Sequence, residues 1–192
     1  TDTFHSVMCF LVKITPSGTV AWARNVAPQS NGGGLGIDSN GSVYVSGSFY
    51  TAGISIGGTV LLNTDPSGGT SGYGGSADVY VAKFDSMGNA LWARSFGGDT
   101  TDYPRAMAVS GNGTIYISGH FCSPVLNAGA FTLTNASSLA ARANFLVRFD
   151  GNGNCDWLRG MNEHIDVMAM ATNSQESIFM AGSIDTGIVD GM

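Results

Sequence analysis

The sequence predicts an all-β fold, and three observations lead to that prediction. Glycine supplies 28 of the 192 residues, whereas charged residues make up only 11% of the chain. Helical bundles have a different composition, rich in Ala, Glu, Lys, Leu and Arg. Runs of β-branched and aromatic residues alternate with short turns that contain Gly, Asn or Asp, which is the pattern of β-hairpins. The chain also repeats itself three times, so one small β unit accounts for nearly all of it.

The first half of each repeat predicts one hairpin. Its three copies are residues 10–24, 80–94 and 145–159. Each copy places a four-residue turn ending in Gly between two apolar runs. Gly suits such a turn because it adopts positive φ without steric strain. Each of the three copies therefore supplies two adjacent antiparallel strands.

The second half of each repeat predicts another hairpin. Its copies are residues 36–49, 108–121 and 171–184, and the first two contain Asn-Gly, a strong hairpin signal. Glycine- and serine-rich connectors follow. The apolar patch 60–62 in the first connector is matched by 131–133, which predicts a short additional strand in each. Each repeat therefore contributes four main strands.

The strand pattern favours stacked sheets over a β-sandwich. Residues 43–45, 115–117 and 178–180 are apolar on both faces of their strands, whereas a sandwich strand has one polar face. Sheets covered on both faces occur when four-stranded blades pack around an axis, as in a β-propeller. We expect one repeat region over 1–192, made of three consecutive four-stranded antiparallel blades in an incomplete or open ring. The sandwich is the alternative.

The predicted blades span about 4–58, 78–134 and 143–191. Propellers close with roughly 4–8 blades, so three do not make an ordinary ring. The chain begins at Thr1 and stops shortly after a fourth strand, and neither end carries a polar capping repeat. Uncapped repeats need neighbours to cover their outer faces. We therefore expect either self-association, into a ring or a fibre, or continuation within a longer chain.

The three tryptophans of the chain occupy one repeat position, each followed two residues later by arginine. The pairs are Trp22 and Arg24, Trp92 and Arg94, and Trp157 and Arg159. Buried aromatic rings contribute large apolar areas to packing. We expect the indoles to pack between blades, and the arginines to bond to neighbouring loops or to the carboxylates of Asp85 and Asp150. These six residues are assigned a structural role.

The repeated pattern resembles the Trp-containing SBBP repeat. Its best copy runs from Asp78 to Phe121 and includes Phe84-Asp85, Gly88-Asn89 and the Trp92 and Arg94 pair, followed by Tyr116 and Gly119. The third copy departs from it, because residues 173–176 replace the glycine turn. The resemblance implies a β-propeller module of secreted or surface proteins, usually without assigned chemistry. It implies no catalytic residues.

Residues 150–156 offer the only candidate for a metal cofactor, a calcium ion. Oxygen-bearing side chains alternate along this segment, in Asp150, Asn152, Asn154 and Asp156. Calcium loops space their ligands in the same way. The segment has no downstream glutamate of the kind that completes an EF-hand loop, and the alternative is a plain hairpin turn. His5, His120 and His164 fall at different repeat positions and share no metal-ligand spacing.

The cysteines and sequons leave the location open, and the expected extracellular or cell-surface location is what the resemblance implies. Cys122 and Cys155 are a candidate disulfide, with free thiols as the alternative, and Cys9 is left over. Sequons for N-glycosylation occur at Asn40, Asn112 and Asn135, which is close to the number expected by chance. Asn40 and Asn112 occupy the same predicted turn, where a glycan fits.

Charge and hydropathy exclude several classes of function. The net charge of −6 and the lack of a basic stripe in the sequence exclude binding to the phosphate backbone of a nucleic acid. No apolar run approaches the roughly 18 residues that a membrane-spanning helix needs. No nucleophile lies in a recognisable catalytic motif. The leading hypothesis is a non-enzymatic extracellular scaffold or interaction module. The alternative is a carbohydrate- or ligand-binding propeller, including a fragment of a glycoside-active or quinone-dependent enzyme.

Overall fold

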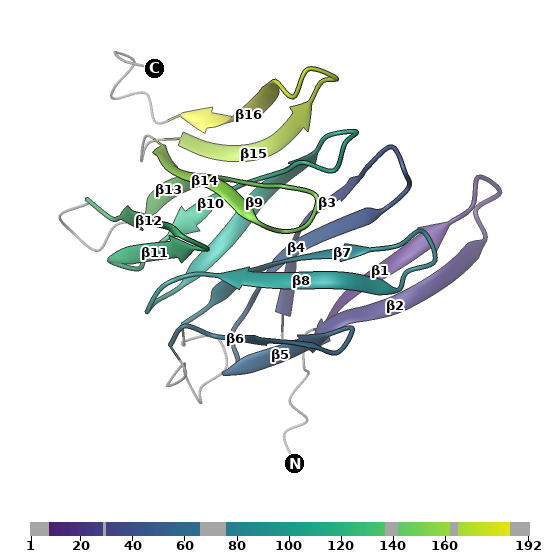
Figure 1. Cartoon of the computed structure of the whole chain (residues 1–192), viewed down its shortest axis with the longest axis horizontal. Helices are drawn as coiled ribbons and strands as arrows, with labels where there is room; N and C mark the ends of the chain where they lie inside the picture. Colours follow the sequence, from purple (N-terminus) through teal and green to yellow (C-terminus); the bar gives the residue numbers. More distant parts are fainter. Residues whose placement is uncertain (1–7, 29, 66–75, 137–141, 162–164, 185–192) are drawn as a thin grey trace.

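The computed structural model describes residues 8–28, 30–65, 76–136, 142–161 and 165–184, and all regular structure in these ranges is β (Figure 1). Sixteen strands are present: β1 (Met8–Ile14), β2 (Val20–Pro28), β3 (Ser30–Ile37), β4 (Val43–Phe49), β5 (Gly53–Ile56), β6 (Thr59–Leu62), β7 (Asp78–Phe84), β8 (Ala90–Phe96), β9 (Asp102–Val109), β10 (Ile115–Phe121), β11 (Val125–Ala128), β12 (Phe131–Thr134), β13 (Ala143–Phe149), β14 (Cys155–Met161), β15 (Ile165–Thr172) and β16 (Ile178–Ile184). The described residues include no helix able to cross a bilayer.

The strands form two complete four-stranded sheets and four separate hairpins. One sheet has the order β3-β4-β7-β8 and the other β9-β10-β13-β14, with every neighbouring pair antiparallel. The hairpins β1-β2 and β15-β16 are two-stranded sheets, as are β5-β6 and β11-β12 in the connectors. The prediction of an all-β fold with four-stranded antiparallel sheets is confirmed.

The grouping of hairpins into sheets differs from the predicted blade ranges 4–58, 78–134 and 143–191. The second hairpin of one repeat pairs with the first hairpin of the next, through β4 with β7 and β10 with β13. The reason lies in burial. Every residue of β4 and of β10 is buried, so each of these strands needs a neighbour along both edges as well as cover on both faces. The sheets are therefore offset from the repeats by two strands.

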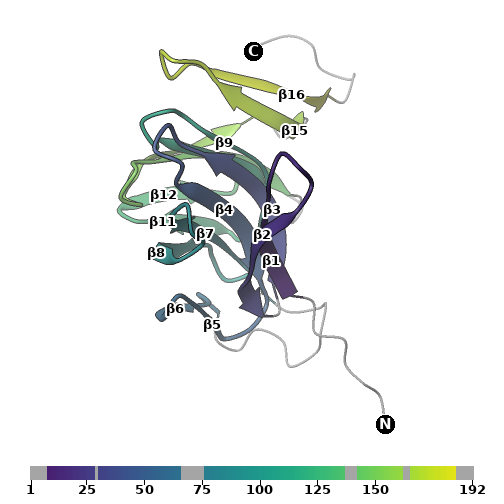
Figure 2. The ribbon, with the colours of Figure 1, turned by 90° about the vertical axis from the view of Figure 1, so that its right-hand side faces the viewer.

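The sheets follow one another in a stack between two half-sheets. The first strands of successive sheets, β3, β9 and β15, contact one another in turn. Figures 1 and 2 show both complete sheets lying between the β1-β2 and β15-β16 hairpins. This arrangement gives the molecule two different ends, one formed by β1-β2 and the other by β15-β16.

Alternate residues of the β3-β4-β7-β8 sheet enter two separate cores. Val43, Val45 and Phe84 pack with Leu11 and Val26 of the first hairpin. The residues between them, among which are Tyr44, Val79 and Val81, pack with Ile115, Ile117 and Phe145 of the next sheet. A strand that is buried on both faces reads as a continuous apolar run. The packing thus explains why these strands lack the alternation of a sandwich.

The hairpin turns are closed by the side chain of their first residue. The Oδ1 atom of Asp85 accepts hydrogen bonds from the backbone N–H groups of Met87 and Asn89, both at 2.9 Å. Asp38, Asp150 and Asn173 close their turns in the same way. Gly88 then adopts a φ of 80°. In the turns of the second hairpins Gly41 and Gly113 have positive φ too, and in the third copy Glu176 takes their place at φ 61°, a conformation that is uncommon outside Gly.

Candidate functional site

The candidate functional site is the contact between successive sheets, together with the two open ends of the stack. The contact is built on a tryptophan brace, by which we mean an indole on the last strand of one sheet and the turn that it touches in the next. Trp22 on β2 donates its Nε1–H to the carbonyl oxygen of Ser86, 3.2 Å away. Trp92 on β8 donates in the same way to Gly151, also at 3.2 Å. The two braces are copies of each other.

Glycine is required where the indole lies on the turn. A Cβ atom built on Gly88 falls 3.0 Å from the Trp22 ring, and one built on Gly153 falls 3.1 Å from the Trp92 ring. Either distance is shorter than an ordinary van der Waals contact, and both glycines also have positive φ. The turn glycine therefore serves the hairpin and the contact between sheets together. The sequence reasoning recognised only its first role.

The arginines of the repeat lie over the tryptophans. The Cζ atoms of Arg24, Arg94 and Arg159 are 5.6, 5.8 and 5.7 Å from the centroids of Trp22, Trp92 and Trp157. Such a cation–π contact contributes about 0.5–1 kcal/mol at an exposed site.

The loop partner of Arg24 is a backbone group. Arg24 donates through Nη2 to the carbonyl oxygen of Met87, 3.1 Å away in the next turn. Asp85, named in advance as a possible partner, accepts hydrogen bonds within its own turn instead. The arginine thus joins the tryptophan brace through a carbonyl oxygen.

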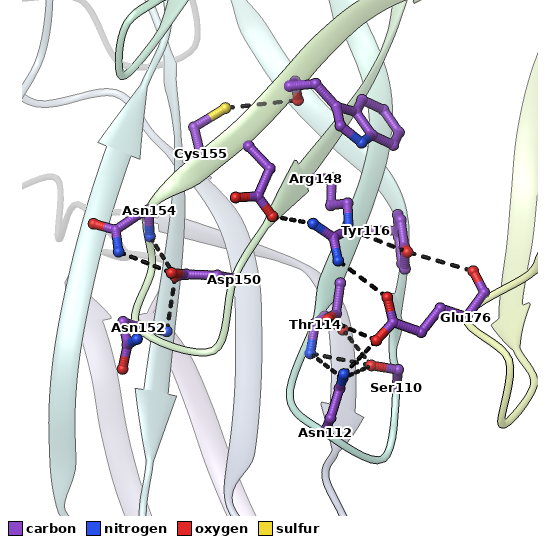
Figure 3. Close-up of polar contacts among 12 residues, drawn as sticks. Ser110, Asn112, Thr114, Tyr116, Arg148, Asp150, Asn152, Asn154, Cys155 and Glu176 are labelled. Atoms are coloured by element: carbon purple, nitrogen blue, oxygen red, sulfur yellow. Dashed lines mark hydrogen bonds and ion pairs between the residues drawn. The ribbon is translucent and has the colours of Figure 1, made fainter.

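A second line of contacts joins the turns of the second hairpins (Figure 3). Arg148 pairs with Asp156 on β14 and, at 3.0 Å, with Glu176 in the turn before β16. Glu176 also accepts a hydrogen bond from the Asn112 amide. The backbone N–H of Ser39 makes the equivalent link one sheet earlier, to the carbonyl oxygen of Gly111 at 3.0 Å. The hydrogen bond from the Asn112 amide, and after it the one from Arg148, lower the pKa of Glu176, so its carboxylate is charged at neutral pH.

A polar cluster ties the β9-β10-β13-β14 sheet to β15. His120 is buried and contacts Asn144 through Nδ1, while its Nε2 lies 3.2 Å from an oxygen of Asp166. Arg105 forms a bidentate ion pair with Asp166, in which Nε lies 3.1 Å from Oδ1 and Nη2 lies 2.7 Å from Oδ2. Arg105 lowers the pKa of Asp166. The contacts of this cluster hold the two sheets together. His5 and His164 lie outside the described residues.

The predicted calcium residues are engaged in other contacts. Asp150 accepts hydrogen bonds from Asn152 and Asn154, as a hairpin turn requires (Figure 3). Asp156 lies on β14 and pairs with Arg148. No group of three or more His, Cys, Asp or Glu suited to a metal occurs in the described ranges. These contacts favour the hairpin turn of the two alternatives, and the calcium assignment stays a prediction.

The candidate disulfide between Cys122 and Cys155 is not formed, and both are free thiols. The register explains the correction. Cys122 follows Phe121, which pairs with Ala143 at one end of β13, whereas Cys155 pairs with Phe149 at the other end. Six residues of strand separate the two positions by about 20 Å, and a disulfide needs Cα atoms within about 7 Å. Cys9 is also free and buried.

The sequon asparagines differ in exposure. Asn40 and Asn112 are exposed and lie in equivalent turns, but the Asn112 amide donates to Glu176. Asn135 follows β12 and is half-buried, and the serine of its sequon, Ser137, lies outside the described residues. Of the three, Asn40 offers the least obstructed position for a glycan. Glycosylation stays a prediction.

The two half-sheets expose the apolar residues that the complete sheets bury. On β1 the exposed apolar side chains are Met8, Phe10 and Ile14, and on β16 they are Phe179, Met180 and Ile184. In β7 every residue except Lys83 is buried, and in β10 every residue is. Phe10 is 68% exposed and Phe179 is 60% exposed. Large exposed apolar groups of this kind mark interaction surfaces.

Comparison with known proteins places this geometry among repeat proteins. The chain is 26% identical to an uncharacterized WD repeat-containing protein of Acanthamoeba polyphaga mimivirus over 92% of its own length. It is 27% identical to the regulatory protein FlaEY of Caulobacter vibrioides over 74% of its length. In both cases it spans 14% of the relative. No family model matches the chain.

The sequence likeness and the two complete sheets support a β-propeller-like repeat. WD repeats build propeller blades of four antiparallel strands, and the two complete sheets of this chain have that construction.

Proposed function

We propose that the chain is a non-enzymatic scaffold of the extracellular space or cell surface, built from Trp-containing propeller repeats of the SBBP kind, and that it associates with copies of itself through its two ends. One observation carries the proposal. The exposed apolar side chains of β1 and β16 occupy strand positions that are buried in both complete sheets, except Met8, whose counterpart on β13 is the half-buried Ala143.

The polar clusters support a structural role. The charged groups of Arg105, Arg148, Asp166 and Glu176 are all paired across sheet contacts. These ion pairs fix how neighbouring sheets pack, and the charged groups are bound to one another. The names of the two relatives, a WD repeat protein and a regulatory protein, agree with a module that acts through interactions.

The exposed sequon at Asn40 supports the extracellular location. In a chain secreted from eukaryotic cells, we expect the intact mass to fall after glycosidase treatment, with Asn40 as the occupied site. An unchanged mass for that secreted chain would remove this support for the location.

Light scattering coupled to size exclusion tests the association. We expect a mass above the 19.8 kDa of one chain, falling toward that value on dilution. The physical reason is that association removes apolar side chains from water. A mass of 19.8 kDa at every concentration up to the solubility limit would contradict the proposal.

A further inference from the structure

The two half-sheets are complementary halves of one four-stranded sheet. In both complete sheets the four strands lie side by side in the order in which they occur along the chain, as in β3-β4-β7-β8. By sequence repeat and by pairing, β15-β16 corresponds to the first two of these strands and β1-β2 to the last two. Among the described residues, β16 pairs with no third strand, whereas β4 pairs with β7 and β10 pairs with β13. Because β1 corresponds to β7 and β13, it is the kind of strand that would complete the sheet next to β16.

We infer that β16 of one copy pairs antiparallel with β1 of a second copy, which forms a composite sheet of order β15-β16-β1-β2. The inference rests on the proposed function and names its partner and its site. The internal sheets fix the register, because β4 pairs with β7 and β10 with β13 without irregularity over seven residues. Transferred to the ends, the register pairs Ile178 with Ile14, Phe179 with Lys13, Met180 with Val12, Ala181 with Leu11, Gly182 with Phe10, Ser183 with Cys9 and Ile184 with Met8.

The register places a cation on an aromatic ring, as the complete sheets do. The Nζ atom of Lys83 lies 5.0 Å from the centroid of its cross-strand neighbour Tyr44. The guanidinium of Arg148 lies 5.9 Å from the centroid of Tyr116, again its cross-strand neighbour. In the composite sheet Lys13 takes this position over Phe179. The end strands therefore carry complementary groups at the position where the internal strands do.

The composite sheet also supplies a turn for the third tryptophan. Trp22 and Trp92 donate to the carbonyl oxygens of Ser86 and Gly151, and the equivalent residue of the β1-β2 turn is Pro16. Gly18 corresponds to Gly88 and Gly153 and has the same φ, 81°. A Cβ atom built on Gly18 has no described atom within 4 Å. Trp157 of one copy fits this open turn of the second copy and repeats the brace.

The count of sheets points to a closed dimer. Each copy contributes two complete sheets and, on average, one composite sheet. Two copies joined at both ends give six sheets, which lies within the roughly 4–8 of closed propellers, whereas three copies give nine. A head-to-tail contact that closes forms a ring. For the 192 residues expressed by themselves, we therefore expect a particle of about 40 kDa, twice their mass.

An engineered cross-link tests the register. We would introduce Ser183→Cys together with Cys122→Ser and Cys155→Ser, so that Cys9 is the only native thiol. The equivalent pair in the complete sheet is His120 and Asn144, whose side chains contact each other. Under mild oxidation we expect most of the protein to run as a covalent dimer on a non-reducing gel. Adding Cys9→Ser should abolish the band, and Ser177→Cys, in the turn before β16, should not form it.

A charge exchange tests the same register without thiols. Phe179→Lys places a second cation opposite Lys13, and like charges directly opposite in a sheet are destabilising. We expect at least a tenfold weaker dimer, and recovery when Lys13→Glu is added. Phe179 is exposed in one copy, so circular dichroism should show an intact fold for both variants.

The outcomes separate this inference from the proposed function. Association by light scattering with neither the cross-link nor the charge rescue would overturn the composite sheet and leave self-association standing. A monomer in light scattering, with no cross-link at any concentration, would overturn both. Covalent dimer and charge rescue together would establish the β16 and β1 pairing.

Discussion

Replacing Trp92 with Ala is expected to lower the free energy of unfolding by about 3–5 kcal/mol, the range for removing a large aromatic side chain from a packed site. Three contacts are lost together. The Trp92 ring meets Tyr44 edge-on at 6.2 Å, its Nε1–H bonds to Gly151, and its face lies on Gly153. The contacts with Gly151 and Gly153 join one sheet to the next, and the contact with Tyr44 lies within the β3-β4-β7-β8 sheet.

Chemical denaturation followed by circular dichroism measures this effect. Leu91→Ala is the matched control, because Leu91 is the preceding residue of β8 and is 56% exposed. Substitutions at such surface positions usually change stability by less than about 0.5 kcal/mol. If Trp92→Ala and Leu91→Ala unfold at the same denaturant concentration, the tryptophan brace does not hold the sheets together.

Raising the pH from 3 to 7 is expected to cost the wild-type chain about 3 kcal/mol of stability through Asp102 alone. Asp102 is fully buried, and this burial raises its pKa from 3.8 to about 6. A carboxyl with a raised pKa binds its proton more tightly in the folded state. Its contribution is therefore complete below pH 4 and is lost as the pH rises through 6. Each pKa unit corresponds to about 1.4 kcal/mol.

The variant Asp102→Asn isolates this effect from other carboxyl groups. Asp38, Asp166 and Glu176 have lowered pKa values and give the opposite pH trend, so the difference between wild type and variant is the quantity to follow.

The amide of Asp102→Asn cannot ionise, but its nitrogen cannot accept the hydrogen bonds that Gly98 and Ser123 donate to the carboxyl oxygens. We expect the variant to be less stable than the wild type at pH 3, and we expect this difference in the free energy of unfolding to narrow by about 3 kcal/mol at pH 7. Asp99→Asn, at an exposed position three residues earlier, is the control. Parallel curves for wild type and Asp102→Asn would contradict the account of this carboxyl.

The local structure of the chain was predictable because its signals are local. The hairpin turns at 85–88 and 150–153 are closed by an aspartate and a positive-φ glycine, as their sequences indicate. The short apolar patches at 60–62 and 131–133 proved to be strands of the β5-β6 and β11-β12 hairpins. Periodicity and turn chemistry were sufficient for these elements.

The pairing between hairpins was not predicted, although a signal for it was present. A repeat in the sequence is the same wherever its boundary is drawn, so it does not say which hairpins share a sheet. Burial of a strand on both faces bears on which hairpins share a sheet. The runs at 43–45 and 80–82 are both apolar throughout, and two central strands of a four-stranded sheet must be neighbours. Applied to the sequence, this rule makes β4 and β7 candidates for one central pair, and the structure shows that they are one.

The contacts between sheets depended on long-range geometry. Nothing in the sequence joins Arg105 with Asp166, or Arg148 with Glu176, since 61 and 28 residues separate the partners. The repeat position of the tryptophans did indicate packing between units. The acceptors of their N–H groups are backbone carbonyls, which carry no sequence signature.

Amide hydrogen exchange tests most directly whether the sheets are offset from the sequence repeats. Backbone amides in the central strands of a sheet are expected to exchange slowest, because both of their edges are bonded. With the observed order, the slow segments are 43–49, 78–84, 115–121 and 143–149. If each repeat instead folded into its own sheet, residues 20–28 with 30–37 and 90–96 with 102–109 would be slowest, and 78–84 would exchange rapidly as an edge; that result would contradict the account.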